Sequence, residues 1–176
     1  MREDTAYALG TTVQVKVYAE SFPSKHSNAV FDEIYRVANV FEDPDPYDLE
    51  VGRVLRVGEQ MERATEGAFS TRLGALISLW GFDKADSRTS REPPSESEVR
   101  RALSKRELNL YGLSKGYAID RAAQKLRDLG YENFVINAGG DVYVAGMRGE
   151  RKWRVAVRHP RYPQRVLGHM DVKGPL

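Results

Sequence analysis

The segment GLSKGYAID, residues 112–120, combines two glycines and a lysine with the start of a helical pattern. Glycine lets a backbone approach a ligand closely, and the free N–H groups at a helix start attract phosphate. Lys115 adds a positive charge at the same place, although the order G-x-x-x-x-G-K-[ST] of a Walker loop is absent. Two interpretations stay open: a phosphate-binding turn, and a strand-to-helix turn with a solvated lysine, which local chemistry alone favours.

A second candidate is NAGGD, residues 137–141. Two adjacent glycines followed by Asp141 would bring backbone and a carboxylate against a sugar, a base or a metal. Adjacent glycines are equally typical of a hairpin turn, because they adopt positive φ angles. The pattern does not choose between the two.

Aromatic residues gather in EGAFSTRLGALISLWGF, residues 66–82. Phe69, Trp80 and Phe82 are predicted to be core side chains rather than a platform for a ligand. The three histidines lie far apart and lack metal-binding spacing, so each is predicted to be a surface or strand residue. They are His26, His159 and His169.

Composition limits the classes of function. The 176 residues carry a formal charge of +2, with 41% hydrophobic and 30% charged residues, which is typical of a soluble globular protein. Basic residues alternate with acidic ones, so no nucleic-acid partner is expected. The absence of cysteine excludes disulfides and thiolate chemistry. The first ten residues do not read as a signal peptide, and no segment is apolar enough to span a bilayer.

The elements that must position these residues follow from hydrophobic periodicity. A strand is expected at 11–18, where valines alternate with polar residues, and helices at 30–41, 49–65 and 73–80. In the second helix, Val54, Leu55, Gly58 and Met61 are predicted to face inward. Residues 83–94 are predicted to form an exposed loop, and Ser95 with Glu98 a capping box. Further strands are expected at 108–110, 133–137, 142–146, 153–158 and 166–172, with a helix from the GLSKGYAID segment to Gly130. Without a regular βαβ rhythm, the fold class is α+β, a mixed and mostly antiparallel sheet with packed helices.

Taken in order, four stretches resemble the ApbE family of flavin transferases. They are LGTTVQVKVYA, TEGAFSTRLGALISLWGF, LNLYGLSKGYAIDRAAQKL, and VINAGGDVYVAG followed by WRVAVRHPR. The resemblance runs from Leu9 to Val172, and K-G-Y-A-x-D-x-A-A followed by A-G-G-D is its specific part. It implies a single ApbE-like domain over residues 1–176.

The resemblance implies an FAD:protein FMN transferase. Such an enzyme uses Mg²⁺ to move FMN from FAD, its substrate, onto a threonine of a flavoprotein acceptor and releases AMP. The alternative is a catalytically degenerate FAD-binding protein of the same fold. The resemblance further implies a periplasmic or cell-envelope location and proximity to a membrane through the acceptor.

The resemblance also implies roles for individual residues. The backbone carbonyl of Ser114 is implied as a metal ligand, and Lys115 and Asp141 are implied to orient the substrate and support the site. The residues implied to contact FAD are Leu9, Ala68, Phe69, Ser70, Tyr111, Lys115, Tyr117 and Asp141.

The chain departs from the family pattern at several positions. Ser70 and Asn109 stand where the family has aspartates, and Tyr111 replaces a glycine, which is expected to narrow the pocket. The family's H-I-I-D-P-x-T-G motif, with its catalytic histidine and metal-binding aspartate and threonine, is not found before Leu176. The expectation is therefore either a domain incomplete at its C-terminal side or a degenerate relative, and no catalytic residue is assigned.

Overall fold

The computed structural model describes residues 1–82 and 92–175. The chain divides into two compact units. The first unit comprises Met1–Asn39 and Lys115–Leu176, and the second comprises Val40–Ser114.

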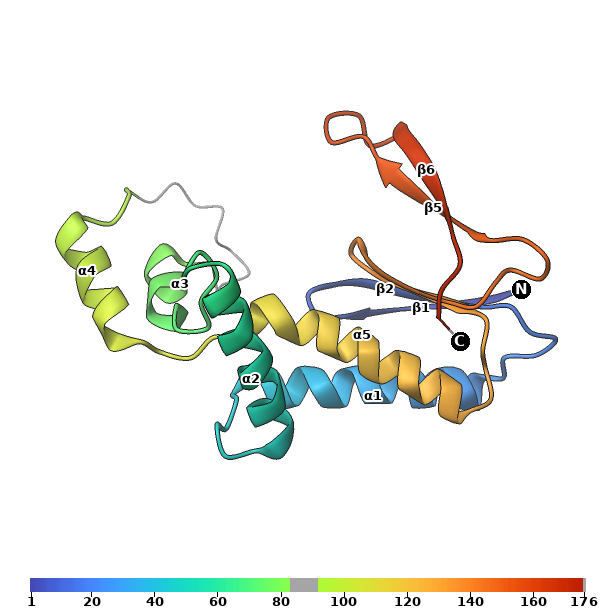
Figure 1. Cartoon of the computed structure of the whole chain (residues 1–176), viewed down its shortest axis with the longest axis horizontal. Helices are drawn as coiled ribbons and strands as arrows, with labels where there is room; N and C mark the ends of the chain where they lie inside the picture. The colour runs from blue at the N-terminus through green and yellow to red at the C-terminus, as the bar shows by residue number, and fades with distance from the viewer. Residues whose placement is uncertain (83–91, 176) are drawn as a thin grey trace. The chain divides into compact units, whose positions relative to one another are not determined.

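An antiparallel sheet of four strands in the order β1-β2-β3-β4 forms the centre of the first unit (Figure 1). The strands are β1 (Arg2–Ala8), β2 (Thr11–Val17), β3 (Phe134–Ala138) and β4 (Asp141–Ala145). The valine alternation of β2 is confirmed, since Val13, Val15 and Val17 are fully buried. Strand β1 was not predicted from the sequence, because it carries the charged Arg2, Glu3 and Asp4. An edge strand tolerates such residues because one side is open to water.

Two helices, α1 (Ser24–Glu42) and α5 (Tyr111–Asp128), supply the apolar side chains that cover one face of this sheet. The residues of α1 that belong to the buried core cluster of this unit are Val30, Phe31 and Ile34. Those of α5 are the predicted inward set Ile119, Ala122, Ala123 and Leu126. Gly130, the predicted helix stop, has a φ of +86° two residues after α5 ends.

An ion pair joins α1 to α5 beside this core. Glu33 accepts hydrogen bonds from Nε of Arg36 at 2.9 Å and from Nε of Arg121 at 2.9 Å. The hydrogen bond from Arg36, together with that from Arg121, lowers the pKa of the Glu33 carboxyl against the opposing effect of burial.

The Glu33→Gln variant is expected to lose about 1–2 kcal/mol of unfolding free energy at neutral pH, because it loses charge-assisted hydrogen bonds. The pKa of this carboxyl is lower in the folded than in the unfolded protein. Its ionised form therefore stabilises the fold at pH values above the unfolded pKa, and this stabilisation is lost as the pH falls through the folded pKa. Urea unfolding at a series of pH values should therefore show the two proteins converging in acid. Glu96→Gln is the control, since Glu96 pairs with Arg100 on an exposed helix surface and should show little effect. A constant gap between wild type and Glu33→Gln at every pH would contradict the prediction.

A second antiparallel pair, β5 (Trp153–Arg158) and β6 (Val166–Val172), belongs to the same unit. The indole Nε1 of Trp153 donates to the carbonyl oxygen of Ala145 on β4 at 3.0 Å. The N–H of Gly174 donates to the carbonyl of Gly146 at 3.2 Å, and a Cβ on Gly174 would overlap the Val144 carbonyl. Both contacts occupy the β4 edge of the four-stranded sheet.

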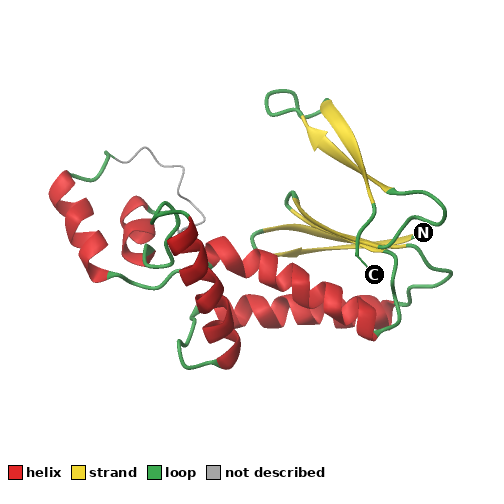
Figure 2. Ribbon diagram, viewed as in Figure 1, coloured by secondary structure: helices red, strands yellow, loops and turns green. Residues whose placement is uncertain are grey.

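The second unit contains α2 (Leu49–Ala64), α3 (Gly74–Trp80) and α4 (Glu96–Lys105), shown as helices in Figure 2. The side chain of Asp48 accepts hydrogen bonds from two backbone N–H groups and so begins α2. The predicted capping box of Ser95 and Glu98 is confirmed at the start of α4. Most of the predicted loop at 83–94 lies outside the described residues.

Three side-chain predictions in this unit were wrong. Met61 is exposed on α2, whereas Val54 and Gly58 are buried as expected. Trp80 and Phe82 stack on each other, with ring centroids 6.4 Å apart, but they remain 41% and 72% exposed rather than forming core. Hydrophobic spacing identified the helices correctly but not how far each apolar side chain is covered.

The architecture is α+β with antiparallel sheets and packed helices, as expected. The predicted strand at 108–110 is absent, because these residues lead directly into α5. Among the described residues, no helix combines the length and apolar composition needed to cross a bilayer.

Candidate functional site

The GLSKGYAID segment lies wholly within α5, which begins at Tyr111. The carbonyl of Leu110 accepts the N–H groups of Leu113 and Ser114, and the Asn109 side chain accepts the N–H of Tyr111 at 3.1 Å. Lys115 and its neighbouring glycine therefore lie inside the helix. The expectation that these residues form a glycine-rich turn before the helix was wrong, because they form the first turns of the helix itself.

The first glycine of the segment allows an aromatic side chain to approach the helix. A Cβ on Gly112 would lie only 3.2 Å from Cε2 of Phe69. The segment that carries Phe69 is also fixed to the residues before α5, since the Thr71 carbonyl accepts the Asn109 N–H at 2.8 Å. Two stretches that the sequence separates by about forty residues are thus adjacent within the second unit.

Neighbouring groups fix the local shape of residues 68–70. The hydroxyl of Thr65 accepts the Phe69 N–H at 3.0 Å, and the hydroxyl of Ser70 accepts the Arg72 N–H at 3.1 Å. Gly58 on α2 is buried against the Thr71 methyl group, where a Cβ would have no room. Phe69 is half-buried and Ala68 is exposed, so the segment is held firmly while one side stays open to solvent.

Tyr111 and Tyr117 both lie on α5, and their side chains differ in exposure. Tyr111 is 53% exposed, while Tyr117 is half-buried. Desolvation raises the pKa of the nearby Asp120 carboxyl, although that side chain still reaches solvent. The first helical turns of α5 thus present aromatic surface, a lysine and a carboxylate.

Within the first unit, Lys115 lies near the β3–β4 turn. Its Nζ is 3.8 Å from Oδ2 of Asp141. Gly139 and Gly140 have φ angles of +63° and +110°, and the Asn137 side chain accepts the Gly140 N–H at 3.0 Å. The hairpin-turn interpretation of NAGGD is confirmed, and Asp141 is placed beside a cation.

Leu9 occupies the β1–β2 turn with a φ of +55°, an uncommon conformation for a branched residue. Its side chain is partly buried against the core of the first unit. The neighbouring Thr11 packs so closely on Gly139 that a Cβ at that glycine would clash. The β1–β2 and β3–β4 turns therefore lie together at one end of the sheet.

The metal-binding prediction for Ser114 concerns a carbonyl in the first turn of α5. Ser114 is buried, and a carbonyl at this helical position normally accepts an N–H four residues later. Among residues 1–82 and 92–175, no group of three His, Asp or Glu side chains is placed to hold a metal ion. The Ser114 carbonyl alone does not make a magnesium site, because Mg²⁺ requires several oxygen ligands.

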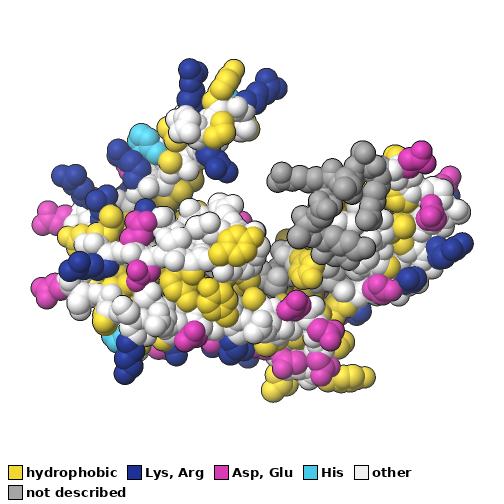
Figure 3. All heavy atoms as spheres, turned by 180° about the vertical axis from the view of Figure 1, so that it is seen from behind, with side chains coloured by type: hydrophobic (Ala, Val, Ile, Leu, Met, Phe, Trp, Pro, Cys, Tyr) yellow, Lys and Arg dark blue, Asp and Glu magenta, His cyan; other side chains and the backbone are white. Residues whose placement is uncertain are grey.

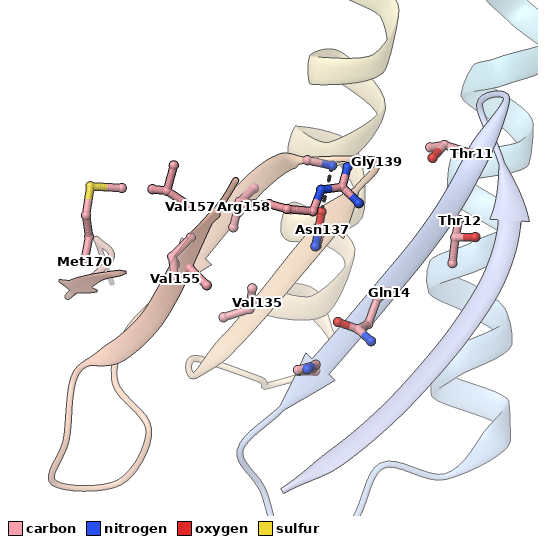
Figure 4. A pocket seen from close by; sticks show the side chains of 14 residues that line it. Thr11, Thr12, Gln14, Val135, Asn137, Gly139, Val155, Val157, Arg158 and Met170 are labelled. Atoms are coloured by element: carbon pink, nitrogen blue, oxygen red, sulfur yellow. Dashed lines mark hydrogen bonds between the residues drawn. The ribbon is translucent and has the colours of Figure 1, made fainter. Parts of the chain in front are cut away.

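The open face of the four-stranded sheet lines a cleft of about 1000 Å³ (Figure 4). Polar side chains of β2 and β3 line one wall, among them Thr12, Gln14 and Asn137, and Val155 of β5 lines the other. Asn137 belongs to the NAGGD segment considered above, whereas Thr12 and Gln14 were not predicted as site residues from the sequence. The alternation of valines and polar residues in β2 could have predicted them, because the polar side chains must lie on the face of the sheet opposite the core.

The amino-acid sequence of this chain is similar to a family model and to curated proteins. Residues 9–174 match the model of the ApbE family. A curated protein from Rhodobacter capsulatus named FAD:protein FMN transferase is 30% identical over 70% of this chain and 27% of its own length. A protein of the same name from Haemophilus influenzae is 25% identical over 66% of this chain and 40% of its own length. The chain thus matches less than half the length of these curated relatives.

Solved structures agree in fold. The crystal structure of the ApbE protein from Thermotoga maritima matches 98% of this chain and 68% of its own, with a TM-score of 0.81 and 25% identity. The flavin transferase ApbE from Vibrio cholerae matches 98% of this chain and 69% of its own, with a TM-score of 0.76 and 19% identity.

Proposed function

The chain belongs to the ApbE family, and from this we propose that it acts in FAD:protein FMN transfer, moving the FMN half of FAD onto a threonine of a flavoprotein acceptor. The observation that carries the proposal is the family match over residues 9–174, which includes all the candidate site residues described above. In the reaction, the threonine hydroxyl gives up its proton as its oxygen forms a bond to the phosphorus of the FMN half. The pyrophosphate P–O bond breaks and AMP leaves with the electron pair.

The side chains of the chain suit binding and orientation of FAD. Phe69 and Tyr111 offer aromatic surface for a flavin or adenine ring. Lys115 supplies a positive charge for the phosphates, and Asp141 at 3.8 Å from its Nζ restrains that side chain. We assign these residues to substrate binding, together with Leu9, Ala68, Ser70 and Tyr117.

Magnesium dependence rests on the resemblance to the family alone. A bound Mg²⁺ would neutralise charge on the pyrophosphate. Because the described residues contain no group of three His, Asp or Glu side chains that could hold a metal ion, no step of the proposed reaction is assigned to the metal.

The second candidate function is binding of FAD without transfer. The departure from the family pattern at Asn109 favours it: this residue stands where the family has an aspartate, and its side-chain oxygen accepts the Tyr111 N–H. This residue therefore has a structural role at the start of α5.

Two measurements separate these functions. Titration of FAD fluorescence with the protein should show saturable binding for both, so an unchanged signal at high micromolar FAD would remove both. Incubation with FAD, Mg²⁺ and a flavoprotein acceptor should then add the mass of FMN to the acceptor. Saturable binding with no mass increase would select the second candidate.

The Lys115→Ala variant is expected to weaken FAD binding by about 1–2 kcal/mol, because a charge-assisted contact to phosphate is lost. The dissociation constant from fluorescence titration measures this change. Lys125→Ala, a variant at another lysine of α5, should leave it unaltered. Equal affinities for the Lys115→Ala variant and wild type would make Lys115 a surface lysine.

By the same resemblance, we propose that the acceptor is met in the periplasm or cell envelope. Fractionation of cells that produce the native protein tests this location. Recovery in the cytosolic fraction alone would contradict it.

A further inference from the structure

Positive charge is concentrated in the C-terminal part of the first unit. Residues 147–173 contain eight Lys and Arg and only two Asp and Glu, a formal excess of six positive charges in a chain whose total is +2. No carboxylate occurs from Arg151 to Met170. Figure 3 shows Lys and Arg side chains gathered over the β5–β6 hairpin. The alternation of basic and acidic residues expected for the whole chain therefore does not hold here.

Internal partners neutralise little of this charge. Arg154 pairs with Asp171 across the two strands, and its Nε lies 2.8 Å from Oδ1 of the carboxylate. Arg158 and Arg161 form no ion pair with any residue from the described ranges. Both side chains are exposed, so they are available to an external anion.

The same hairpin exposes apolar side chains. Leu167 is 65% exposed and Val166 is 58% exposed on β6. Tyr162 lies in the connecting loop, with the guanidinium of Arg165 5.2 Å from its ring centroid. The hairpin tip, residues 158–167, thus combines arginines, a tyrosine and two aliphatic side chains.

We propose that this hairpin tip binds a lipid surface that carries anionic headgroups. Arginines near such a surface are attracted to its negative potential, while neighbouring apolar side chains enter the boundary between headgroups and acyl chains. An acidic protein would also complement the arginines, but exposed Val and Leu are under-represented among the dominant residues of protein interfaces. A nucleic acid would use the arginines but not Val166 and Leu167. This inference does not depend on flavin transfer.

Co-sedimentation with lipid vesicles tests the proposal on the whole chain. Wild type should bind vesicles of phosphatidylcholine mixed with phosphatidylglycerol, and binding should weaken with added salt. It should not bind vesicles of phosphatidylcholine alone. Equal binding to both kinds of vesicle, or to neither, would overturn the proposal.

Matched variants separate the two contributions. The double variant Arg158→Gln with Arg161→Gln should lower the vesicle partition coefficient about 30-fold, since each arginine contributes near the surface. Arg53→Gln with Arg56→Gln changes the net charge equally at exposed positions of α2 and should have no such effect. Leu167→Ser should weaken binding, whereas Leu49→Ser, at another exposed leucine, should not. If a hairpin variant and its matched control lost vesicle binding equally, the lipid-binding surface would not be the hairpin tip.

Two further probes distinguish other partners. Poly-L-glutamate represents an acidic protein segment, and a single-stranded DNA oligonucleotide represents a nucleic acid. The lipid proposal would be overturned if the protein bound one of these probes tightly, bound anionic vesicles only weakly, and kept its affinity for the probe in the Leu167→Ser variant. The hairpin tip would then be assigned to that polyanion. Vesicle binding that requires both the arginines and Leu167 supports the lipid proposal.

Discussion

Replacing Phe134 with alanine is expected to lower the free energy of unfolding by about 3–5 kcal/mol, the cost typical of removing a fully buried phenylalanine. Phe134 is fully buried at the start of β3, and its ring stacks on that of Tyr143 with centroids 6.1 Å apart. The guanidinium of Arg127 lies 5.8 Å from the Phe134 ring centroid and donates to the Tyr143 hydroxyl at 2.9 Å. The truncation therefore leaves a cavity and removes two aromatic contacts together. Urea denaturation followed by circular dichroism measures the change.

Val142→Ala provides the control for this first prediction. Val142 lies on β4 but faces the open side of the sheet, where it is partly exposed. Truncation of Val142 should lower the free energy of unfolding by about 1 kcal/mol or less, much less than the Phe134→Ala change. Similar losses for the two variants would mean that the sheet is not packed against α1 and α5 as described.

The Gly146→Ala variant is expected to lose about 2–4 kcal/mol of unfolding free energy, for two reasons that add. Gly146 has a φ of +55°, which strains any residue with a Cβ. A Cβ there would also lie 2.7 Å from the carbonyl oxygen of Glu132 and would overlap the Asn133 side chain. That side chain accepts the Met147 N–H at 2.8 Å, so moving it would break a hydrogen bond. Chemical denaturation gives the magnitude.

Gly130→Ala separates strain from collision. Gly130 has a φ of +86°, but a Cβ built there meets nothing within 4 Å. Its substitution should therefore cost only the backbone strain, about 1 kcal/mol. If the two alanine variants were equally stable, the collision at Gly146 would be relieved without cost and the prediction would be wrong.

Periodicity in the sequence was enough to predict most of the fold. The valines of β2 and the helical spacing of α1, α2 and α5 each follow from one dominant buried face, and the capping box of Ser95 is a local interaction. Strand β1 has only a weak buried face, formed by the small residues Ala6 and Ala8, and its charged residues hide the period of two. Residues 108–110 looked like a strand, yet the Asn109 side chain begins a helix there instead. Whether such a segment forms a strand or the start of a helix depends on side-chain hydrogen bonds to the backbone, which its hydrophobic pattern does not predict.

The candidate site was only partly predictable for a related reason. Local chemistry around Lys115 favoured a plain turn, and it was the order of several motifs that indicated flavin transfer. The approach of Phe69 to Gly112 and of Lys115 to Asp141 depends on tertiary packing. No rule of spacing brings residues so far apart in the chain together.

The contacts of Trp153 and Gly174 with β4 limit how the four-stranded sheet can grow. An open sheet edge is a template for another strand, and it can lead to aggregation. At the β4 edge, the Ala145 carbonyl is already bonded to an indole and the Gly146 carbonyl to a backbone N–H. At the other edge, the first three residues of β1 are charged, and charged residues disfavour pairing with an apolar strand. One end of the β4 edge is thus occupied by a side chain and a backbone N–H, and the start of the β1 edge is protected by charge.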